Sequence, residues 1–180
     1  ALDLYRRLLA RHPREARLLH LAGLAAHQHG RHEEALGWLG EVARRSPGDA
    51  QLHYHLGDAL EAAGRLQEAA ASYRRALALE PRLAAAQNGL GNALGGLGDW
   101  QAAAEAYRKA LTIDPKRALS LSNLGTALVR LGRLKEALPC FERAVALQPG
   151  YLEAILHLGH TRCGLGDIVD DIYRGRHRFV

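Results

Sequence analysis

Several residue types are scarce in this 180-residue sequence: it has no methionine and only two cysteines, two phenylalanines and two tryptophans. Cys140 and Cys163 are far apart and fit no zinc-ligand spacing, so we expect two reduced thiols in a cytoplasmic protein. No apolar run is as long as a membrane span, and the amphipathic opening "ALDLYRRLLARHP" is not a secretory signal, so no membrane partner is predicted. Because the first residue is not methionine, we expect a fragment or a processed product.

Charge of one sign is not concentrated anywhere in the chain. The formal net charge of +5 and a pI near 9.6 permit an anionic partner. The arginines are nevertheless spread along the sequence with glutamates near them, which is typical of a solvated surface. A surface that binds nucleic acid usually adds aromatic or base-reading groups. The sequence therefore predicts no specific nucleic-acid partner.

Motifs for catalysis and for cofactor binding are also missing. No serine nucleophile elbow is present, and the glycine-rich stretch "NGLGNALGGLGDW" at 88–100 is not followed by the G-K-[ST] of a phosphate-binding loop. The histidines lack a cysteine or carboxylate set at a ligand spacing that would close a metal site. We therefore predict no enzyme activity, no cofactor and no metal ion for this chain.

What the sequence does contain is a period of 34 residues, which must be interpreted before any single motif. Prolines, two series of glycines and a series of aromatic residues all follow it. The prolines are Pro13, Pro47, Pro81, Pro115 and Pro149; the glycines are Gly23, Gly57, Gly91, Gly125 and Gly159, and Gly30, Gly64, Gly98, Gly132 and Gly166; the aromatic residues are Tyr5, Tyr73, Tyr107 and Phe141, with Leu39 in the remaining place.

Each period is predicted to form two helices. In the segment 50–83, apolar residues recur at helical spacing before and after Gly64, a position that favours a left-handed helix C-cap, and Pro81 ends the second helix. Gly91 falls at the mid-helix position of the period, where a missing side chain lets two helices approach closely. Gly89, Gly95 and Gly96 follow no period, so we expect the helix that carries them to be soft and to leave a bare surface beside it.

The periodic residues resemble the tetratricopeptide repeat (TPR) signature W-x2-L-G-x2-Y…A-x3-F…P. The match recurs three times, as His53, Leu56, Gly57, Leu60, Ala69, Tyr73, Ala76 and Pro81; as Gln87, Leu90, Gly91, Leu94, Ala103, Tyr107, Ala110 and Pro115; and as Leu121, Leu124, Gly125, Leu128, Ala137, Phe141, Ala144 and Pro149. The resemblance implies an all-α TPR solenoid of antiparallel helix pairs that form a right-handed superhelix.

The expected array covers residues 1–166. Residues 1–15 are the second helix of a partial repeat, 16–49, 50–83, 84–117 and 118–151 are full repeats, and 152–166 is the first helix of a fifth. Residues 167–180 depart from the pattern, with Asp171 and Gly175 where a small residue and an aromatic residue are expected, and we interpret them as a divergent capping helix or a tail.

A solenoid offers a long preformed groove, and the resemblance implies that the first helix of each repeat lines its concave wall. The expected peptide-binding residues are those that lie off the core stripe of these helices. They are His20, His27, Tyr54, His55, Asp58, Asn88, Asn92, Asn123, Thr126, Arg130, His157 and His160. The asparagines are the best contact candidates, because an amide both donates and accepts hydrogen bonds and so suits a peptide main chain. Solvated surface residues are the alternative interpretation.

The predicted function is therefore a protein–protein interaction module that binds a peptide or protein segment. Two alternatives stay open. Residues 20–36, "HLAGLAAHQHGRHEEAL", are similar to bacterial TPR arrays that precede a transferase domain. This resemblance implies that the chain is the non-catalytic, substrate-recruiting part of an enzyme related to O-GlcNAc transferase or to sulfotransferases. The other alternative is a self-assembling scaffold, a homo-oligomer formed through its end helices.

Overall fold

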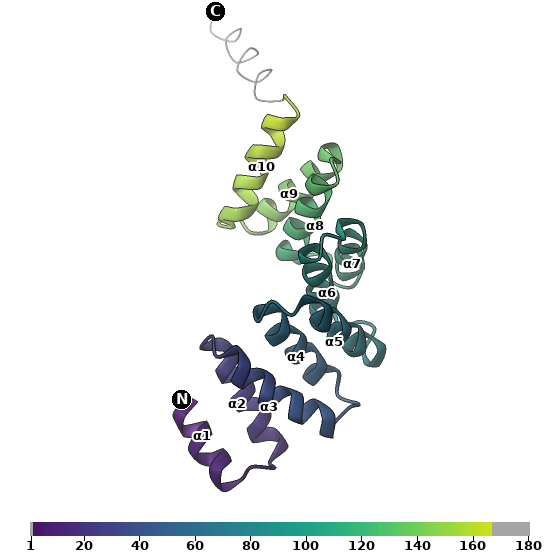
Figure 1. Cartoon of the computed structure of the whole chain (residues 1–180). Coiled ribbons are helices and arrows are strands. Elements are labelled where there is room, and N and C mark those ends of the chain that lie inside the picture. The colour runs from purple at the N-terminus through teal and green to yellow at the C-terminus, as the bar shows by residue number, and fades with distance from the viewer. Residues whose placement is uncertain (1, 167–180) are drawn as a thin grey trace, which may run out of the picture. The chain divides into compact units, whose positions relative to one another are not determined.

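The computed structural model describes residues 2–166, and over that range it is built from helices without strands (Figure 1). The helices are α1 (Leu2–Arg11), α2 (Ala16–Gln28), α3 (His32–Arg45), α4 (Ala50–Ala62), α5 (Leu66–Leu79), α6 (Ala84–Gly96), α7 (Trp100–Ile113), α8 (Ala118–Arg130), α9 (Leu134–Leu147) and α10 (Leu152–Gly164). The expected capping helix or tail at 167–180 lies outside the described residues.

The chain divides into two compact units, Ala1–Leu97 and Gly98–Val180, which we call unit 1 and unit 2. Unit 1 contains α1 to α6, and unit 2 contains α7 to α10. Each full repeat expected from the 34-residue period contains one consecutive pair of these helices. Within the units, α2 packs on α3, α4 on α5, and α8 on α9. The boundary between the units falls in the turn between α6 and α7, inside the repeat expected at 84–117.

The helix ends follow from local sequence. The Asp49 carboxylate caps the start of α4 by accepting hydrogen bonds from the main-chain N–H groups of Gln51 (2.9 Å) and Leu52 (3.3 Å). After α4, Gly64 adopts a φ of +75°, and the N–H of Arg65 donates to the carbonyl of Leu60 at 2.9 Å. This bond is the Schellman closure of a helix C-terminus, so the predicted left-handed cap at Gly64 is confirmed.

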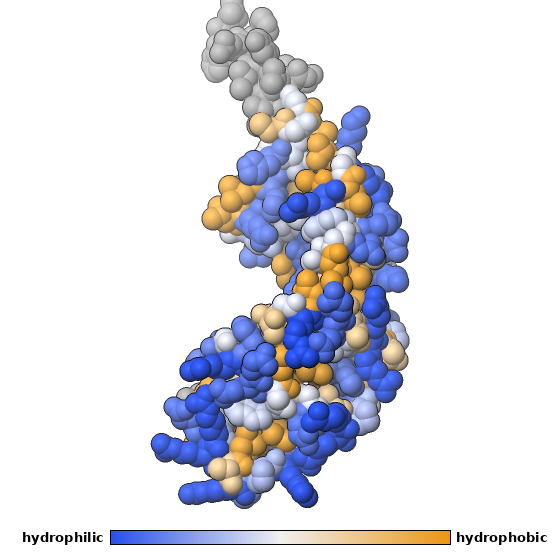
Figure 2. All heavy atoms as spheres, viewed as in Figure 1, coloured by the Kyte–Doolittle hydropathy of each residue, from blue (hydrophilic) through white to orange (hydrophobic). Residues whose placement is uncertain are grey.

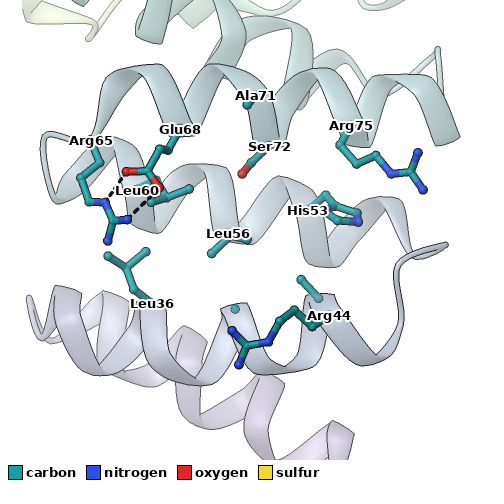
Figure 3. Close-up of a pocket in the computed structure, with 12 residues that line it drawn as sticks. Leu36, Arg44, His53, Leu56, Leu60, Arg65, Glu68, Ala71, Ser72 and Arg75 are labelled. Carbon is teal, nitrogen blue, oxygen red and sulfur yellow. Dashed lines mark hydrogen bonds and ion pairs between the residues drawn. The ribbon is translucent and has the colours of Figure 1, made fainter.

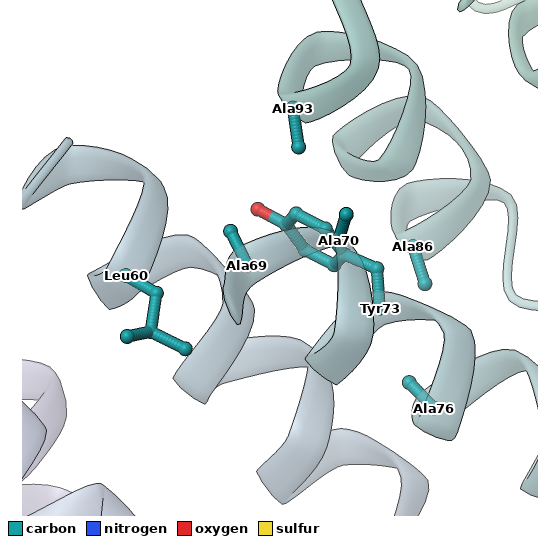
Figure 4. Close-up of a cluster of buried hydrophobic side chains, with 7 residues drawn as sticks. All are labelled: Leu60, Ala69, Ala70, Tyr73, Ala76, Ala86 and Ala93. Carbon is teal, nitrogen blue, oxygen red and sulfur yellow. The ribbon is translucent and has the colours of Figure 1, made fainter. Parts of the chain in front are cut away.

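The core of unit 1 is made largely of alanine around one large ring. Tyr73 of α5 is fully buried in a cluster with small side chains of α5 and α6 (Figure 4). A Cβ atom built on Gly57 would lie 2.6 Å from Tyr73 Cε1, and one built on Gly89 would lie 2.5 Å from Tyr73 Cζ. Glycine is therefore needed on both sides of this ring, from α4 and from α6.

The outer surface of the helices is largely polar. In the space-filling view, hydrophilic residues cover most of the visible face of unit 1, and apolar residues are visible in smaller areas between them (Figure 2). Within residues 2–166, no helix combines the length and the apolar character that crossing a lipid bilayer requires.

Candidate functional site

The first helices of unit 1 bring polar side chains together on one face. α4 packs against both α2 and α6, so the three helices form a continuous surface, which we call the first-helix face. Because a helix turns 100° per residue, residues 54, 58 and 61 share one side of α4. The polar and aromatic side chains on this face are His20 and His27 of α2, Tyr54, His55, Asp58 and Glu61 of α4, and Asn88 and Asn92 of α6.

Two histidines link α2 to α4. His20 Nε2 lies 2.9 Å from His55 Nδ1, and the Tyr54 ring lies next to His55 with 5.2 Å between ring centroids. Partial burial lowers the pKa of His20 below 6.5, and burial together with the neighbouring His20 lowers the pKa of His55. Both imidazoles are therefore favoured in the neutral form, in which one ring donates its N–H to the other.

A network of two carboxylates joins α4 to α5 and α6. Tyr73 Oη lies 2.8 Å from Asp58 Oδ1 and 2.8 Å from Glu61 Oε2, and Asn92 Nδ2 donates to Glu61 Oε1 at 3.2 Å. No lysine or arginine of residues 2–166 forms an ion pair with Asp58 or Glu61. The network is thus acidic, and the neutral groups of Tyr73 and Asn92 form hydrogen bonds with it.

The phenol of Tyr73 has one hydrogen for two carboxylates. If both carboxylates are ionised, only one of them receives the hydrogen bond from the phenol. The oxygen of the other carboxylate then faces the lone pairs of the phenol oxygen. Burial, and then the charge of Asp58, raise the pKa of Glu61, while its hydrogen bonds to Tyr73 and Asn92 act in the opposite direction. The net effect raises the pKa of Glu61 and so favours its neutral form more than in an exposed glutamate.

The two asparagines of α6 lie in different environments. Asn92 is half-buried and bonds Glu61, whereas Asn88 is only 4% exposed and offers little surface to a partner. The expected bare surface near Gly89 is wrong, because Gly89 is buried under the Tyr73 ring. A Cβ on Gly96 would likewise lie 2.7 Å from Leu66 Cδ1. These two glycines let α6 pack against α5.

Unit 2 carries its own first-helix side chains on α8 and α10, which pack against each other. The Arg130 guanidinium lies over the Trp100 ring at 5.3 Å from its centroid, a cation–π arrangement. His157 stacks on the buried Phe141 ring, with 5.4 Å between centroids. Thr126 is half-buried and donates to the main-chain carbonyl of Ser122, Asn123 is half-buried, and His160 is exposed.

Sequence reasoning missed Glu61, which lies at the centre of the acidic network. Asp58 is among the candidates predicted from sequence and Glu61 is not, yet the two carboxylates meet around Tyr73. The available signal was the spacing of three residues between two acidic side chains, which places both on one side of a helix. Tyrosine in place of the signature phenylalanine was the second signal, because a buried hydroxyl needs a hydrogen-bond partner.

Histidines, cysteines and carboxylates do not converge on a metal position. Within the described part of the chain, no group of three or more of these side chains is placed to hold an ion. Cys140 is half-buried and Cys163 is exposed, and both are free thiols. Burial raises the pKa of the Cys140 thiol, which disfavours the reactive thiolate.

Family models of the tetratricopeptide repeat match most of the chain. Three of them, described as tetratricopeptide or TPR repeats, cover residues 1–50, 57–98 and 83–150. No curated protein sequence gives a significant match.

Solved structures of TPR proteins share the fold. A structure of MamA is 26% identical, with a TM-score of 0.75 over 82% of this chain and 86% of that one. YrrB, whose structure is described as a TPR protein with an unusual peptide-binding site, is 19% identical with a TM-score of 0.72 over 92% and 86%. The first TPR of Spaghetti (RPAP3), bound to the HSP90 peptide SRMEEVD, is 22% identical with a TM-score of 0.65 over 66% and 94%. Residues 2–166 form ten helices that follow the 34-residue period, and the chain belongs to the tetratricopeptide repeat family.

Proposed function

We propose that this chain is a protein-interaction module that binds a peptide segment on its first-helix face. One observation carries the proposal. α2, α4 and α6 place half-buried polar and aromatic side chains on one face, where a solenoid core has no need of them. The first TPR of Spaghetti (RPAP3), solved with a bound peptide, and YrrB, described as having a peptide-binding site, support the same use of the fold.

The chemistry of this face suits a peptide main chain. Imidazoles, amides and carboxyl groups on it both donate and accept hydrogen bonds, as the N–H and C=O groups of an extended peptide require. The hydrogen bonds between His20 and His55 and between Asn92 and Glu61 hold these groups in place before any partner arrives. Such preorganisation reduces the entropy lost on binding.

The activity that we propose is binding and not catalysis. The three matching family models are all repeats, and the described residues contain no catalytic constellation of nucleophile, base and orienting group. The partner that we propose is therefore a protein or peptide segment. The role of a recruiting array within a larger transferase rests on sequence resemblance, and no observation in residues 2–166 favours it specifically.

The test starts from a random peptide library displayed on phage and selected on the wild-type chain. The affinity of the strongest selected peptide is then measured by fluorescence polarisation for the wild type and for the variant Asn92→Ala. Loss of this amide is expected to weaken binding about fivefold, since a hydrogen bond contributes on the order of 1 kcal/mol. The control is Gln67→Ala, which removes an exposed amide from α5.

Two outcomes would contradict this function. One is the selection of no peptide, and the other is equal affinity for Asn92→Ala and for Gln67→Ala. Main-chain recognition makes a further demand on the peptide itself. N-methylation of its central amides should cost more affinity than substitution of its side chains by alanine, because methylation removes the donors that the face accepts.

Self-assembly is a second candidate, and one observation favours it. On α10, the side chains of Leu152, Ile155 and Leu156 are 66%, 39% and 55% exposed to solvent. Their spacing places them on one stripe of the helix. We propose that this stripe contacts a second copy of the chain. Sedimentation velocity over a range of concentrations tests it, because Leu156→Glu should keep the chain monomeric where the wild type associates. A wild type that stays monomeric throughout would exclude it.

A further inference from the structure

A groove lies in unit 1 between α3, α4 and α5 (Figure 3). Neither Asp58 nor Glu61 is among the residues that line it. Leu56 and Leu60 of α4 form its floor, and α3 and α5 form its walls. Leu36, Ala43 and Ala71 continue the apolar lining, and the volume is about 640 Å³. This is within the usual range of ligand-binding clefts. The groove shares no residue with the first-helix face.

The groove exists because α3 has glycine where later second helices have long side chains. The positions 34, 68 and 102 residues after Gly40 are Arg74, Arg108 and Glu142. A Cβ built on Gly40 would have no atom within 4 Å, so the space beside it is open. Glycine in a helix interior costs about 1 kcal/mol relative to alanine, and no close approach of a neighbouring helix requires it here.

The charges around the groove are unevenly compensated. Arg44 forms an ion pair with Glu41 on the α3 wall, and Arg65 pairs with Glu68 at one end. At the other end, Arg75 Nη2 donates to the carbonyl of Pro47 at 3.2 Å and forms no ion pair with any carboxylate of residues 2–166 (Figure 3). His53 Nε2 lies 3.1 Å from the same carbonyl. This end of the groove therefore has an unbalanced positive charge above an apolar floor.

We propose that the groove binds a short acidic segment of a partner protein, with leucine-like side chains on the apolar floor and a carboxylate against Arg75. Both halves of this chemistry follow from the lining. Leu36 and Leu56 are only partly buried, so apolar contacts from a partner would remove more of their surface from water. A carboxylate forms charge-assisted hydrogen bonds with a guanidinium. Nucleic acid fits less well, because the lining contains no phenylalanine, tyrosine or tryptophan on which a base stacks.

The experiment uses the full chain and a fluorescein-labelled acidic peptide, EELLEELLEELL, followed by fluorescence polarisation at low and high ionic strength. The matched peptide KKLLKKLLKKLL has the same leucines and the opposite charge. The acidic peptide is expected to bind and to weaken as salt is added, while the basic peptide is expected not to bind.

Two pairs of variants separate the groove from general effects on folding. Gly40→Glu fills the groove with the residue found at position 142 and is expected to weaken binding at least about tenfold, whereas Gly40→Ala leaves the groove open and is expected to bind as the wild type does. Arg75→Glu is compared with Arg143→Glu, because Arg143 donates the same kind of bond to the carbonyl of Pro115, at 3.0 Å, in unit 2. Only Arg75→Glu should lose binding.

Several results would overturn the proposal: no binding of the acidic peptide, equal binding of the basic peptide, or equal losses in Arg75→Glu and Arg143→Glu. Tight binding of a labelled oligouridine that the acidic peptide does not displace would indicate that the positive charge at this end binds nucleic acid and not a peptide. The variant Asn92→Ala should bind the acidic peptide normally. The two surfaces can therefore fail or succeed independently.

Discussion

The replacement of Gly89 by alanine is the sharpest test of how unit 1 is packed. In an unconstrained helix this change stabilises the protein by about 1 kcal/mol, because alanine has the higher helix propensity. Here the new Cβ would lie 2.5 Å from Cζ, 2.6 Å from Cε1 and 2.9 Å from Oη of Tyr73. The Tyr73 ring is fully buried and cannot rotate away without displacing its neighbours.

The expected magnitude follows from these opposing effects. Overpacking a core costs about 1–3 kcal/mol, and three close contacts with a rigid ring place this case near the upper value. After the gain in helix propensity is subtracted, Gly89→Ala should lower the free energy of unfolding by about 2 kcal/mol. Urea unfolding followed by far-UV circular dichroism measures it.

A matched control lies in the same unit. Gly37 is exposed in the middle of α3, and no atom lies within 4 Å of a Cβ built on it, so Gly37→Ala should stabilise unit 1 by about 1 kcal/mol. The destabilisation by Gly89→Ala should also shrink in a Tyr73→Leu background, since the two residues are in direct contact. A Gly89→Ala variant as stable as Gly37→Ala would refute the packing argument.

The remaining predictions concern titration and backbone strain. Folding raises the pKa of Glu61, so its contribution to stability is present at low pH and is lost as the pH rises through the raised value. Glu61→Gln, which mimics the protonated carboxyl, should therefore stabilise the chain more near pH 8 than near pH 4. A difference in urea midpoints between variant and wild type that stays constant with pH would exclude this. Folding lowers the pKa of His20 and His55, so their contribution to stability is present above pH 6.5 and is lost as the pH falls through the lowered values. Proton NMR should show two imidazoles that titrate below pH 6.5. Titration of both at or above pH 6.5 would count against the burial of the pair. Gly64→Ala places a side chain at a φ of +75° and should cost about 1 kcal/mol in thermal or urea unfolding, with no cost expected if the turn relaxes freely.

The fold was predictable from sequence because its information is local and repeated. Each of the four full repeats has a helix-ending glycine in one phase and a helix-terminating proline in another, and the structure places two helices in every one of them. A repeat contacts only its neighbours, so no long-range pairing had to be guessed. The family followed from the same periodic residues.

The candidate site was predictable only in part. Helical geometry placed Tyr54, Asp58 and Asn92 on the first-helix face, because the face of a helix follows from residue spacing alone. Whether these residues contact a partner stays a prediction. Burial of Asn88 was not predictable, because exposure depends on how α6 lies against its neighbours and not on its own sequence.

The sequence by itself determined the repeat length, the helix ends and the residue types available to each face, because these depend on backbone preferences within one or two turns. Only the tertiary structure decided which side chains from different helices meet. It brought Glu61, Tyr73 and Asn92 into one network, placed Gly89 under the Tyr73 ring, and opened a groove beside Gly40. These contacts join residues 12 to 31 positions apart, or depend on space that neighbouring helices leave unfilled. Packing, and not the periodic pattern, therefore decides them.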